Sequence, residues 1–275
     1  ITNEGARFSM KKRLAVLCLA AMTLTACGNS NTQTDDASNA AASTDPTEVT
    51  VFAAASLTES LNQIKEVYES EHPEVELVYN FDSSGTLQTQ IEEGAVCDLF
   101  ISAGQKQMDG LDDLVKSDSR VDLLENTVVL VAPKGAESTP ASFEDLANVS
   151  SIALGNSDVP VGQYSEEILK YMGLWDGLNA DGKITFGSNV KEVTSQVAAA
   201  AVDCGIVYRT DAASEPEIEV VATAPAESYS PAIYPAAVLT NATQAEEAQE
   251  FLDYLKTDKA MDVFASVGFS RPNEA

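Results

Sequence analysis

Four loops of this sequence combine small polar or glycine residues with the start of an expected helix, and each could bind an anion. The loops are 55–56, 83–85, 161–162 and 189–190. At such a position, free backbone N–H groups and the positive end of the helix dipole attract negative charge without Lys or Arg. Ser56 and Ser84 add hydroxyl donors, and Tyr208 adds a phenol at a strand end. A single loop of this kind is usually structural, but together they predict a site that holds a tetrahedral oxyanion with neutral donors.

The rest of the composition narrows the possible functions. The chain of 275 residues carries 43 Asp and Glu against 16 Lys and Arg, a formal net charge of -27. This balance argues against nucleic acid or an anionic membrane face as a partner, because both require clustered cations. His72 is the only histidine in the sequence, which leaves little room for a histidine triad or a multi-histidine metal site. A hydrolase with Ser56 or Ser84 as nucleophile would lack a base. We therefore expect no enzyme, no cofactor and no side chain that ligates a metal directly.

The N-terminal segment has the features of an export signal. A cationic stretch and an apolar run too short to span a bilayer precede the tripeptide Leu-Thr-Ala and Cys27. This arrangement resembles the bacterial lipobox, in which the cysteine is lipidated and becomes the mature N-terminus. We predict a signal peptide over 1–26, of which 1–9 precede a plausible start methionine. Residues 27–47 are polar and predict a flexible tether. The protein is then exported and lipid-anchored to the outer face of the bacterial cytoplasmic membrane.

Alternating strand and helix patterns lie behind the four loops. Alternating or β-branched apolar runs predict strands, and apolar residues three and four apart predict the helices between them. The expected strands are 48–54, 75–81, 98–102, 127–132, 151–154, 184–186, 205–208, 218–222 and 233–239. Strand, short loop and helix in repetition predict parallel sheets with helices on both faces.

The alternation falls into two blocks, which predicts an α/β protein of two lobes, each a mostly parallel sheet flanked by helices. Ligands of such sheets lie beyond the carboxyl ends of the strands, where the four loops are. We therefore expect the anion in a cleft between the lobes. The first lobe is assigned to 48–128 and 238–275, and the second lobe to 129–237.

Two helix starts carry predicted caps. Ser56 and Glu59 form a capping box, in which the Ser56 hydroxyl accepts a hydrogen bond from the Glu59 amide. Asn189, three residues before Glu192, is expected to cap its own helix. The cysteines of the body give a further prediction. Cys97 and Cys204 each start a strand, which places them in different lobes and away from the cleft, so we expect two unpaired, buried thiols.

Five segments in order resemble the successive motifs of the molybdate-binding proteins, the substrate-binding components of molybdate ABC transporters. They read VFAAASLTESL, FDSSGTLQTQIEEGAVCDLFISA, VPVGQYSEEILKYMGLW, NVKEV and GIVYRTDA. The resemblance runs from about residue 48 to residue 269. It implies the two-lobe periplasmic-binding fold of type II, with the chain crossing between the lobes at 127–134 and 233–239.

The resemblance also implies the ligand contacts. The Ser56 and Ser84 hydroxyls with their amides, the amides of Val161 and Val190, and the Tyr208 hydroxyl would hold the oxyanion. Val161 replaces the alanine usual in the family, which matters little if only its amide binds. The implied protein is a monomeric lipoprotein that captures molybdate, and tungstate, and delivers it to a membrane permease driven by a cytoplasmic ATPase. Two alternatives stay open: a receptor for another tetrahedral oxyanion such as sulfate or phosphate, and an exported surface lipoprotein with no transport role.

Overall fold

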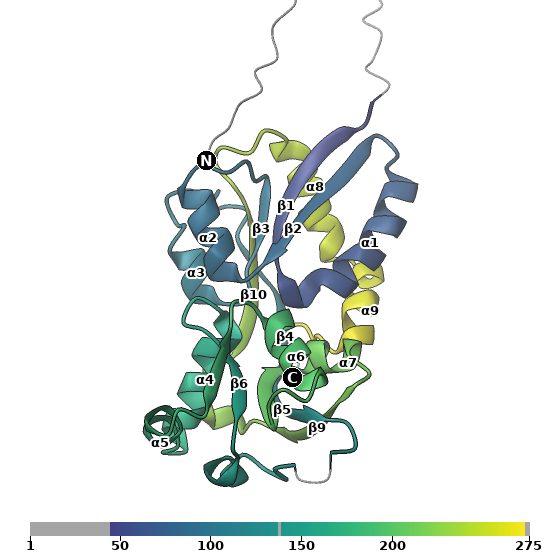
Figure 1. Cartoon of the computed structure of the whole chain (residues 1–275). Coiled ribbons are helices and arrows are strands. Elements are labelled where there is room, and N and C mark those ends of the chain that lie inside the picture. Colours follow the sequence, from purple (N-terminus) through teal and green to yellow (C-terminus); the bar gives the residue numbers. More distant parts are fainter. Residues whose placement is uncertain (1–44, 137–138, 273–275) are drawn as a thin grey trace, which may run out of the picture. The chain divides into compact units, whose positions relative to one another are not determined.

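The computed structural model describes residues 45–136 and 139–272, and these residues form two five-stranded sheets with helices around them (Figure 1). The predicted signal peptide over 1–26, Cys27 and nearly all of the predicted tether lie outside the described residues. In the part of the chain that is described, no helix combines the length and the apolar composition that a membrane crossing requires. The two sheets define the two lobes.

The first lobe contains a sheet in the order β2-β1-β3-β10-β4. Its strands are β1 (Thr47–Ala54), β2 (Val75–Asp82), β3 (Leu99–Ile101), β4 (Val121–Asn126) and β10 (Ala232–Val238). Its helices are α1 (Thr58–Glu71), α2 (Ser84–Glu92), α3 (Gln105–Asp109), α8 (Ala245–Leu255) and α9 (Asp258–Val267). Alternation along β1 separates two cores. Phe52 packs with Leu87 and Ile91 of α2, whereas Val51 belongs to the cluster that includes Leu61 of α1. The helices therefore cover both faces of this sheet (Figure 1).

The second lobe repeats the plan with a sheet in the order β7-β6-β8-β5-β9. Its strands are β5 (Val128–Pro133), β6 (Ile152–Gly155), β7 (Ile184–Gly187), β8 (Cys204–Tyr208) and β9 (Ile218–Thr223). Its helices are α4 (Pro160–Tyr171), α5 (Trp175–Ala180), α6 (Val190–Ala198) and α7 (Arg209–Ser214). The described residues also form short 3-10 turns: η1 (Ala55–Leu57) before α1 of the first lobe, η2 (Glu144–Asn148) before β6 and η3 (Ala226–Ser228) before β10.

Each sheet is mixed, and the predicted two-lobe α/β fold is confirmed. Strands β1, β2 and β3 are mutually parallel, as are β6, β7 and β8, whereas β10 and β5 run antiparallel to their neighbours. The reason is the chain path. Strands β5 and β10 each follow a crossing from the other lobe, so they enter their sheet at the end where its parallel strands finish.

The two crossings differ in position from the sequence prediction. The first is a single residue, Thr127, between β4 and β5, because 128–133 is already a strand of the second sheet. The second lies between β9 and β10, at 224–231. The prediction of a crossing at 233–239 is wrong, since this segment is the body of β10, between β3 and β4 in the first sheet. The boundary between 237 and 238 is wrong for the same reason: 232–237 belong to the first lobe.

The predicted caps have opposite outcomes. Asn189 caps α6, because its side chain accepts a hydrogen bond from the Glu192 amide at 3.0 Å. The capping box of Ser56 and Glu59 is wrong. Ser56 lies in the 3-10 turn η1, and α1 starts without a side-chain cap. The Ser56 hydroxyl instead contacts Tyr234 at 2.9 Å, a competing partner far away in the sequence.

The prediction for the two cysteines of the body is confirmed. Cys97 and Cys204 are both free and buried. Cys97 precedes β3 of the first sheet and Cys204 begins β8 of the second. Burial raises the pKa of each thiol to about 12, so both remain protonated and have little thiolate reactivity at neutral pH.

Candidate anion-binding site

A small pocket lies where loops of the two lobes meet. Its volume is ≈ 10 Å³, about the room that one water molecule needs, so the groups around it are close-packed about a common point. The lining residues are Ala54, Ala55, Ser56, Asp82, Ser83, Ser84, Ala103, Val159, Pro160, Val190 and Tyr208. They come from the carboxyl ends of β1, β2, β3 and β8 and from the starts of α2, α4 and α6. Within the described residues, this lining includes no Lys or Arg.

The structure brings four of the five predicted ligand residues to this pocket: Ser56, Ser84, Val190 and Tyr208. Val161 is fully buried in the first turn of α4, and its neighbours Val159 and Pro160 line the pocket in its place. Its backbone amide is still one of the first-turn N–H groups that have no partner within the helix. Contact of these five residues with an anion stays a prediction.

Ser84 is held as a hydrogen-bond donor toward the pocket. It is the first residue of α2, whose N-cap is Ser83: the Ser83 hydroxyl accepts a hydrogen bond from the Thr86 amide. The Ser84 hydroxyl oxygen accepts a hydrogen bond from the Ala103 amide at 2.9 Å. This bond occupies a lone pair and leaves the Ser84 proton available.

Tyr208 reaches the pocket from the end of β8 in the second lobe. Its hydroxyl donates to the Ala103 carbonyl of the first lobe at 3.4 Å. The ring packs edge to face on Tyr164 and Tyr234. Complete burial raises the pKa of Tyr208 well above its ordinary value, so the phenol keeps its proton. To bind an anion, that proton must turn from its long contact with the Ala103 carbonyl to the pocket.

The start of α4 approaches the second sheet closely because it contains glycine. A Cβ added at Gly162 would lie 2.3 Å from the Gly155 carbonyl oxygen at the end of β6. Any larger residue would push the helix away from the strand. Glycine therefore lets the N-terminus of α4, with the Val161 amide, sit directly at the carboxyl end of β6.

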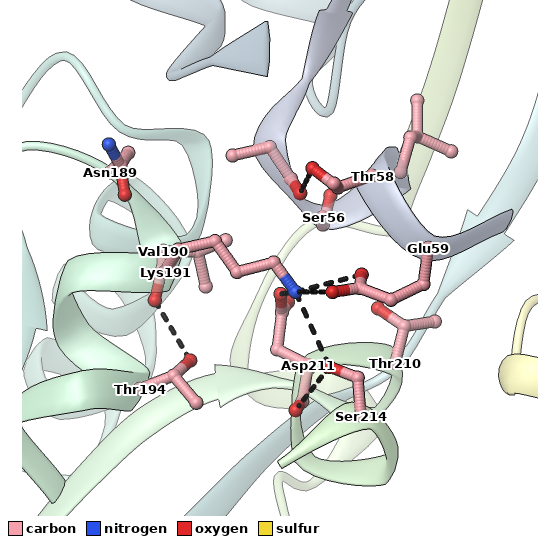
Figure 2. A network of polar contacts seen from close by, with 12 residues as sticks. Ser56, Thr58, Glu59, Asn189, Val190, Lys191, Thr194, Thr210, Asp211 and Ser214 are labelled. Atoms are coloured by element: carbon pink, nitrogen blue, oxygen red, sulfur yellow. Dashed lines mark hydrogen bonds and ion pairs between the residues drawn. The ribbon is translucent and has the colours of Figure 1, made fainter. Parts of the chain in front are cut away.

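Further polar contacts connect the lobes around the pocket. The Gly85 amide of α2 donates to the Asp158 carbonyl at 3.1 Å. The side-chain nitrogen of Asn189 donates to the Asp82 carboxylate at 3.3 Å. The Lys191 ammonium of α6 donates to both carboxylate oxygens of Glu59 in α1, at 2.9 Å each, as Figure 2 shows.

Lys191 also forms an ion pair with a buried carboxylate of its own lobe. Its ammonium lies 3.2 Å from Asp211 of α7, as an ion pair without the geometry of a hydrogen bond, and donates to Ser214 at 3.3 Å (Figure 2). Complete burial outweighs the attraction of Lys191 and raises the pKa of Asp211 to about 6. Burial lowers the pKa of Lys191, but the Asp211 and Glu59 carboxylates outweigh that effect and raise it overall. The ammonium therefore stays charged between two acidic groups.

Sequence reasoning missed Asn126, Lys191, Asp211 and Tyr234. Lys191 and Asp211 lie inside motifs that were recognised, but their partners are on other elements. Tyr234 contacts Ser56 across 178 residues of sequence. No local pattern reports such a contact, so only the topology of β10 could have located it.

Comparison with known proteins agrees with this architecture. The chain matches the family of bacterial extracellular solute-binding proteins over residues 49–270. It is 40% identical over 226 residues to the Bacillus subtilis protein named "Putative ABC transporter substrate-binding lipoprotein YvgL", covering 81% of this chain and 86% of that one. It is 36% identical over 231 residues to the molybdate-binding protein ModA of Haemophilus influenzae, covering 81% of this chain and 90% of the relative.

A solved structure supports the same grouping. The solved structure described as "substrate binding domain of putative molybdenum ABC transporter from Clostridium difficile" superimposes with a TM-score of 0.64 at 36% sequence identity, covering 82% of this chain and 99% of that chain. The two lobes, the pocket between them and these similarities all support the same family assignment. The chain belongs to the family of bacterial extracellular solute-binding proteins and is a homologue of the ModA molybdate-binding proteins.

Proposed function

We propose that this protein is an extracytoplasmic receptor that captures molybdate, and also tungstate, by closing its two lobes around the anion. The observation that carries the proposal is the meeting of neutral donors from both lobes at one pocket whose lining residues include no cationic side chain. Such donors suit a fully deprotonated tetrahedral oxyanion, because all of its oxygens are acceptors. Each hydrogen bond to a charged acceptor contributes about 1.5–3 kcal/mol. The names of the relatives select molybdate among the oxyanions of this shape.

In this proposal each lobe supplies part of the coordination. The Ser56 and Ser84 hydroxyls donate from the first lobe. The Tyr208 hydroxyl and the amides of Val161 and Val190 donate from the second lobe. An anion held by both halves favours the closed arrangement, so binding shifts the population of open and closed molecules toward closure. The ion leaves unchanged, without catalysis and without a cofactor.

The cellular setting follows the same proposal. Lipid on Cys27 anchors the receptor to the outer face of the cytoplasmic membrane, and a polar tether lets the body move. The closed monomer docks on a membrane permease, and a cytoplasmic ATPase drives the transfer of the anion. Mass spectrometry of the mature protein tests the anchor: a diacylglyceryl group on Cys27 is expected, and an unmodified N-terminus upstream of Cys27 would contradict it.

Calorimetric titration tests the ligand. The purified full chain is titrated in parallel with molybdate, tungstate, sulfate and phosphate. We expect tight one-to-one binding of molybdate and tungstate and far weaker binding of the other two. Ser84→Ala and Tyr208→Phe should each weaken molybdate binding by about tenfold or more, the value of one charged hydrogen bond. Binding heat with sulfate or phosphate alone would support an oxyanion receptor but refute molybdate as its ligand. No binding heat with any of the four anions would refute the receptor function.

A further inference from the structure

We propose that Asn126 and Tyr234 are positioning residues that fix the direction of the Ser56 hydroxyl, so that Ser56 directs its proton at the anion. Neither residue lines the pocket. They act on it through the hydrogen bonds behind Ser56, which we call the Ser56 relay: Asn126 to Tyr234 to Ser56. The inference deepens the proposed function and rests on it.

The relay begins with an amide whose orientation is settled by the backbone. The Thr127 amide donates to the Asn126 side-chain oxygen at 2.8 Å, and a backbone N–H can only donate. The opposite end of the Asn126 amide must therefore be its NH2 group. That group donates to Thr210 at 3.0 Å and to Tyr234 at 3.2 Å. Both amide hydrogens are used, and the Asn126 side chain sits in the interior with 4% exposure.

The second step fixes the phenol of Tyr234. Tyr234 is fully buried, and burial raises its pKa well above the ordinary value, so it holds one proton. Its oxygen already accepts a hydrogen bond from Asn126. Its closer hydrogen-bond partner is the Ser56 hydroxyl oxygen, 2.9 Å away. Distance alone would let either oxygen of this pair donate. Because Tyr234 already accepts from Asn126, we assign its proton to Ser56 rather than to Tyr208, whose hydroxyl also interacts with it.

The third step reaches the anion. Ser56 lines the pocket, and its oxygen accepts from Tyr234, so its own proton is left for a ligand. Ser84 reaches the same state by a different route, because its oxygen accepts from the Ala103 amide. Each serine thus accepts one hydrogen bond from the protein and directs its proton at the pocket, Ser84 because of the backbone and Ser56 because of two buried side chains.

This direction determines which anions fit. An oxyanion without protons offers only acceptors and matches both serines. An oxyanion that carries a proton, such as inorganic phosphate at neutral pH, presents an O–H that finds another donor facing it. The unmatched buried groups then weaken binding. The relay therefore favours molybdate over phosphate in addition to any effect of size.

Asn126→Asp reverses the relay with little change in shape. The new carboxylate still accepts from the Thr127 amide, but it can only accept from Tyr234. Tyr234 then turns its proton to that carboxylate, Ser56 must donate to Tyr234, and a serine lone pair faces the anion. We expect molybdate affinity to fall by about 10- to 100-fold, the loss of one hydrogen bond to a charged group. In a Tyr234→Phe background the same substitution adds only its charge. The loss of molybdate affinity that it causes there should therefore be about fivefold or less.

Tyr234→Phe tests the relay without adding a charge, and the ring keeps its packing against Phe269. The Ser56 hydroxyl becomes free to rotate, so it can accept from a protonated anion. The preference for molybdate over inorganic phosphate, measured by calorimetry on the full chain at pH 7, should fall, while the thermal midpoint shows whether the variant is folded. This variant decides the matter even if Asn126→Asp does not fold.

Two results would overturn the relay alone. They are an unchanged molybdate-to-phosphate preference in Tyr234→Phe, and equal losses from Asn126→Asp in the two backgrounds, which would mean that charge alone acts. Binding of molybdate by the wild-type chain with either result leaves the receptor in place and removes the relay. A wild-type chain that binds none of the oxyanions overturns both proposals.

Discussion

Gly85 is the position where one added methyl group should prevent lobe closure without harming either lobe. It is the second residue of α2, and its amide donates to the Asp158 carbonyl of the second lobe at 3.1 Å. A Cβ on Gly85 would lie 2.3 Å from the Asp158 carbonyl oxygen and 2.9 Å from the Asp158 Cβ. The nearest obstacles are backbone atoms and the first atom of a side chain, which cannot rotate away. We therefore predict that Gly85→Ala keeps the lobes apart.

The size of the effect follows from these distances. Ordinary contact begins near 3.4 Å, so the two loops must separate by about 1 Å at this point. That shift breaks the Gly85 hydrogen bond, which contributes about 1 kcal/mol. It also carries the donors of one lobe beyond hydrogen-bond distance of an anion held by the other. Losing two bonds to a charged acceptor, about 1.5–3 kcal/mol each, predicts an affinity loss of about 100-fold or more.

The stability of the first lobe should move in the opposite direction. Gly85 lies in a helix, where alanine is more favourable than glycine by up to about 1 kcal/mol. Ligand-free Gly85→Ala should therefore unfold at the same temperature as the wild-type protein or at a higher one. Molybdate affinity is measured by calorimetry and the thermal midpoint by circular dichroism.

Gly177→Ala is the matched control. Gly177 is also helical, in α5, and a Cβ there would have no atom within 4 Å. This variant should keep wild-type affinity. A Gly85→Ala protein that binds molybdate within twofold of the wild type would refute closure at this contact. A protein that loses affinity and thermal stability together would show that the methyl group damages the fold instead.

Three further predictions concern the charged and titratable groups. Glu59→Gln should weaken molybdate binding by only about two- to fivefold, because the Glu59–Lys191 pair is partly exposed, and calorimetry in about 1 M NaCl should erase the difference; a loss that survives high salt would contradict an ionic contribution. The pKa of Asp211 is raised from 3.8 to about 6, so its contribution to stability is greatest below pH 4 and is lost as pH rises through 6. In urea unfolding, the free energy of unfolding of Asp211→Asn should therefore rise relative to that of the wild type between pH 4 and pH 8, by at most about 3 kcal/mol. A difference that stays constant with pH would contradict this. Peptide mapping after alkylation at pH 8 should find Cys97 and Cys204 unmodified in the native protein and modified in urea; rapid native labelling would contradict their burial.

Local patterns predicted what depends on neighbours in sequence. Asn189 caps α6 as predicted because the amide it accepts from is three residues away. The two-lobe fold was also predictable, because the alternation that makes each strand is written within the strand. The same patterns could not decide which sheet receives a strand, so the segment 233–239 was correctly expected to be extended and wrongly assigned to a crossing.

The failures share a physical cause, competition from distant partners. Ser56 has the right residue type for a cap, but its oxygen is 2.9 Å from the Tyr234 hydroxyl. The side chain of Glu59, the other member of the predicted capping box, pairs with Lys191 across 132 residues of sequence. These contacts exist only once β10 and α6 are in place. The sequence could therefore name Ser56, Ser84, Val190 and Tyr208, which line the pocket, without revealing what holds Ser56.

The position of β10 has a consequence for how the protein is made. The first sheet needs a strand that the chain supplies only after the entire second lobe, since β10 lies between β3 and β4. During synthesis and translocation, β4 therefore emerges long before the neighbour it pairs with, and its backbone groups stay available to wrong partners. The second sheet is built from one continuous stretch and can be finished first. The lobe that leaves the ribosome first is thus the last to be completed, so a chain truncated before β10 would hold one finished lobe and one with an open sheet.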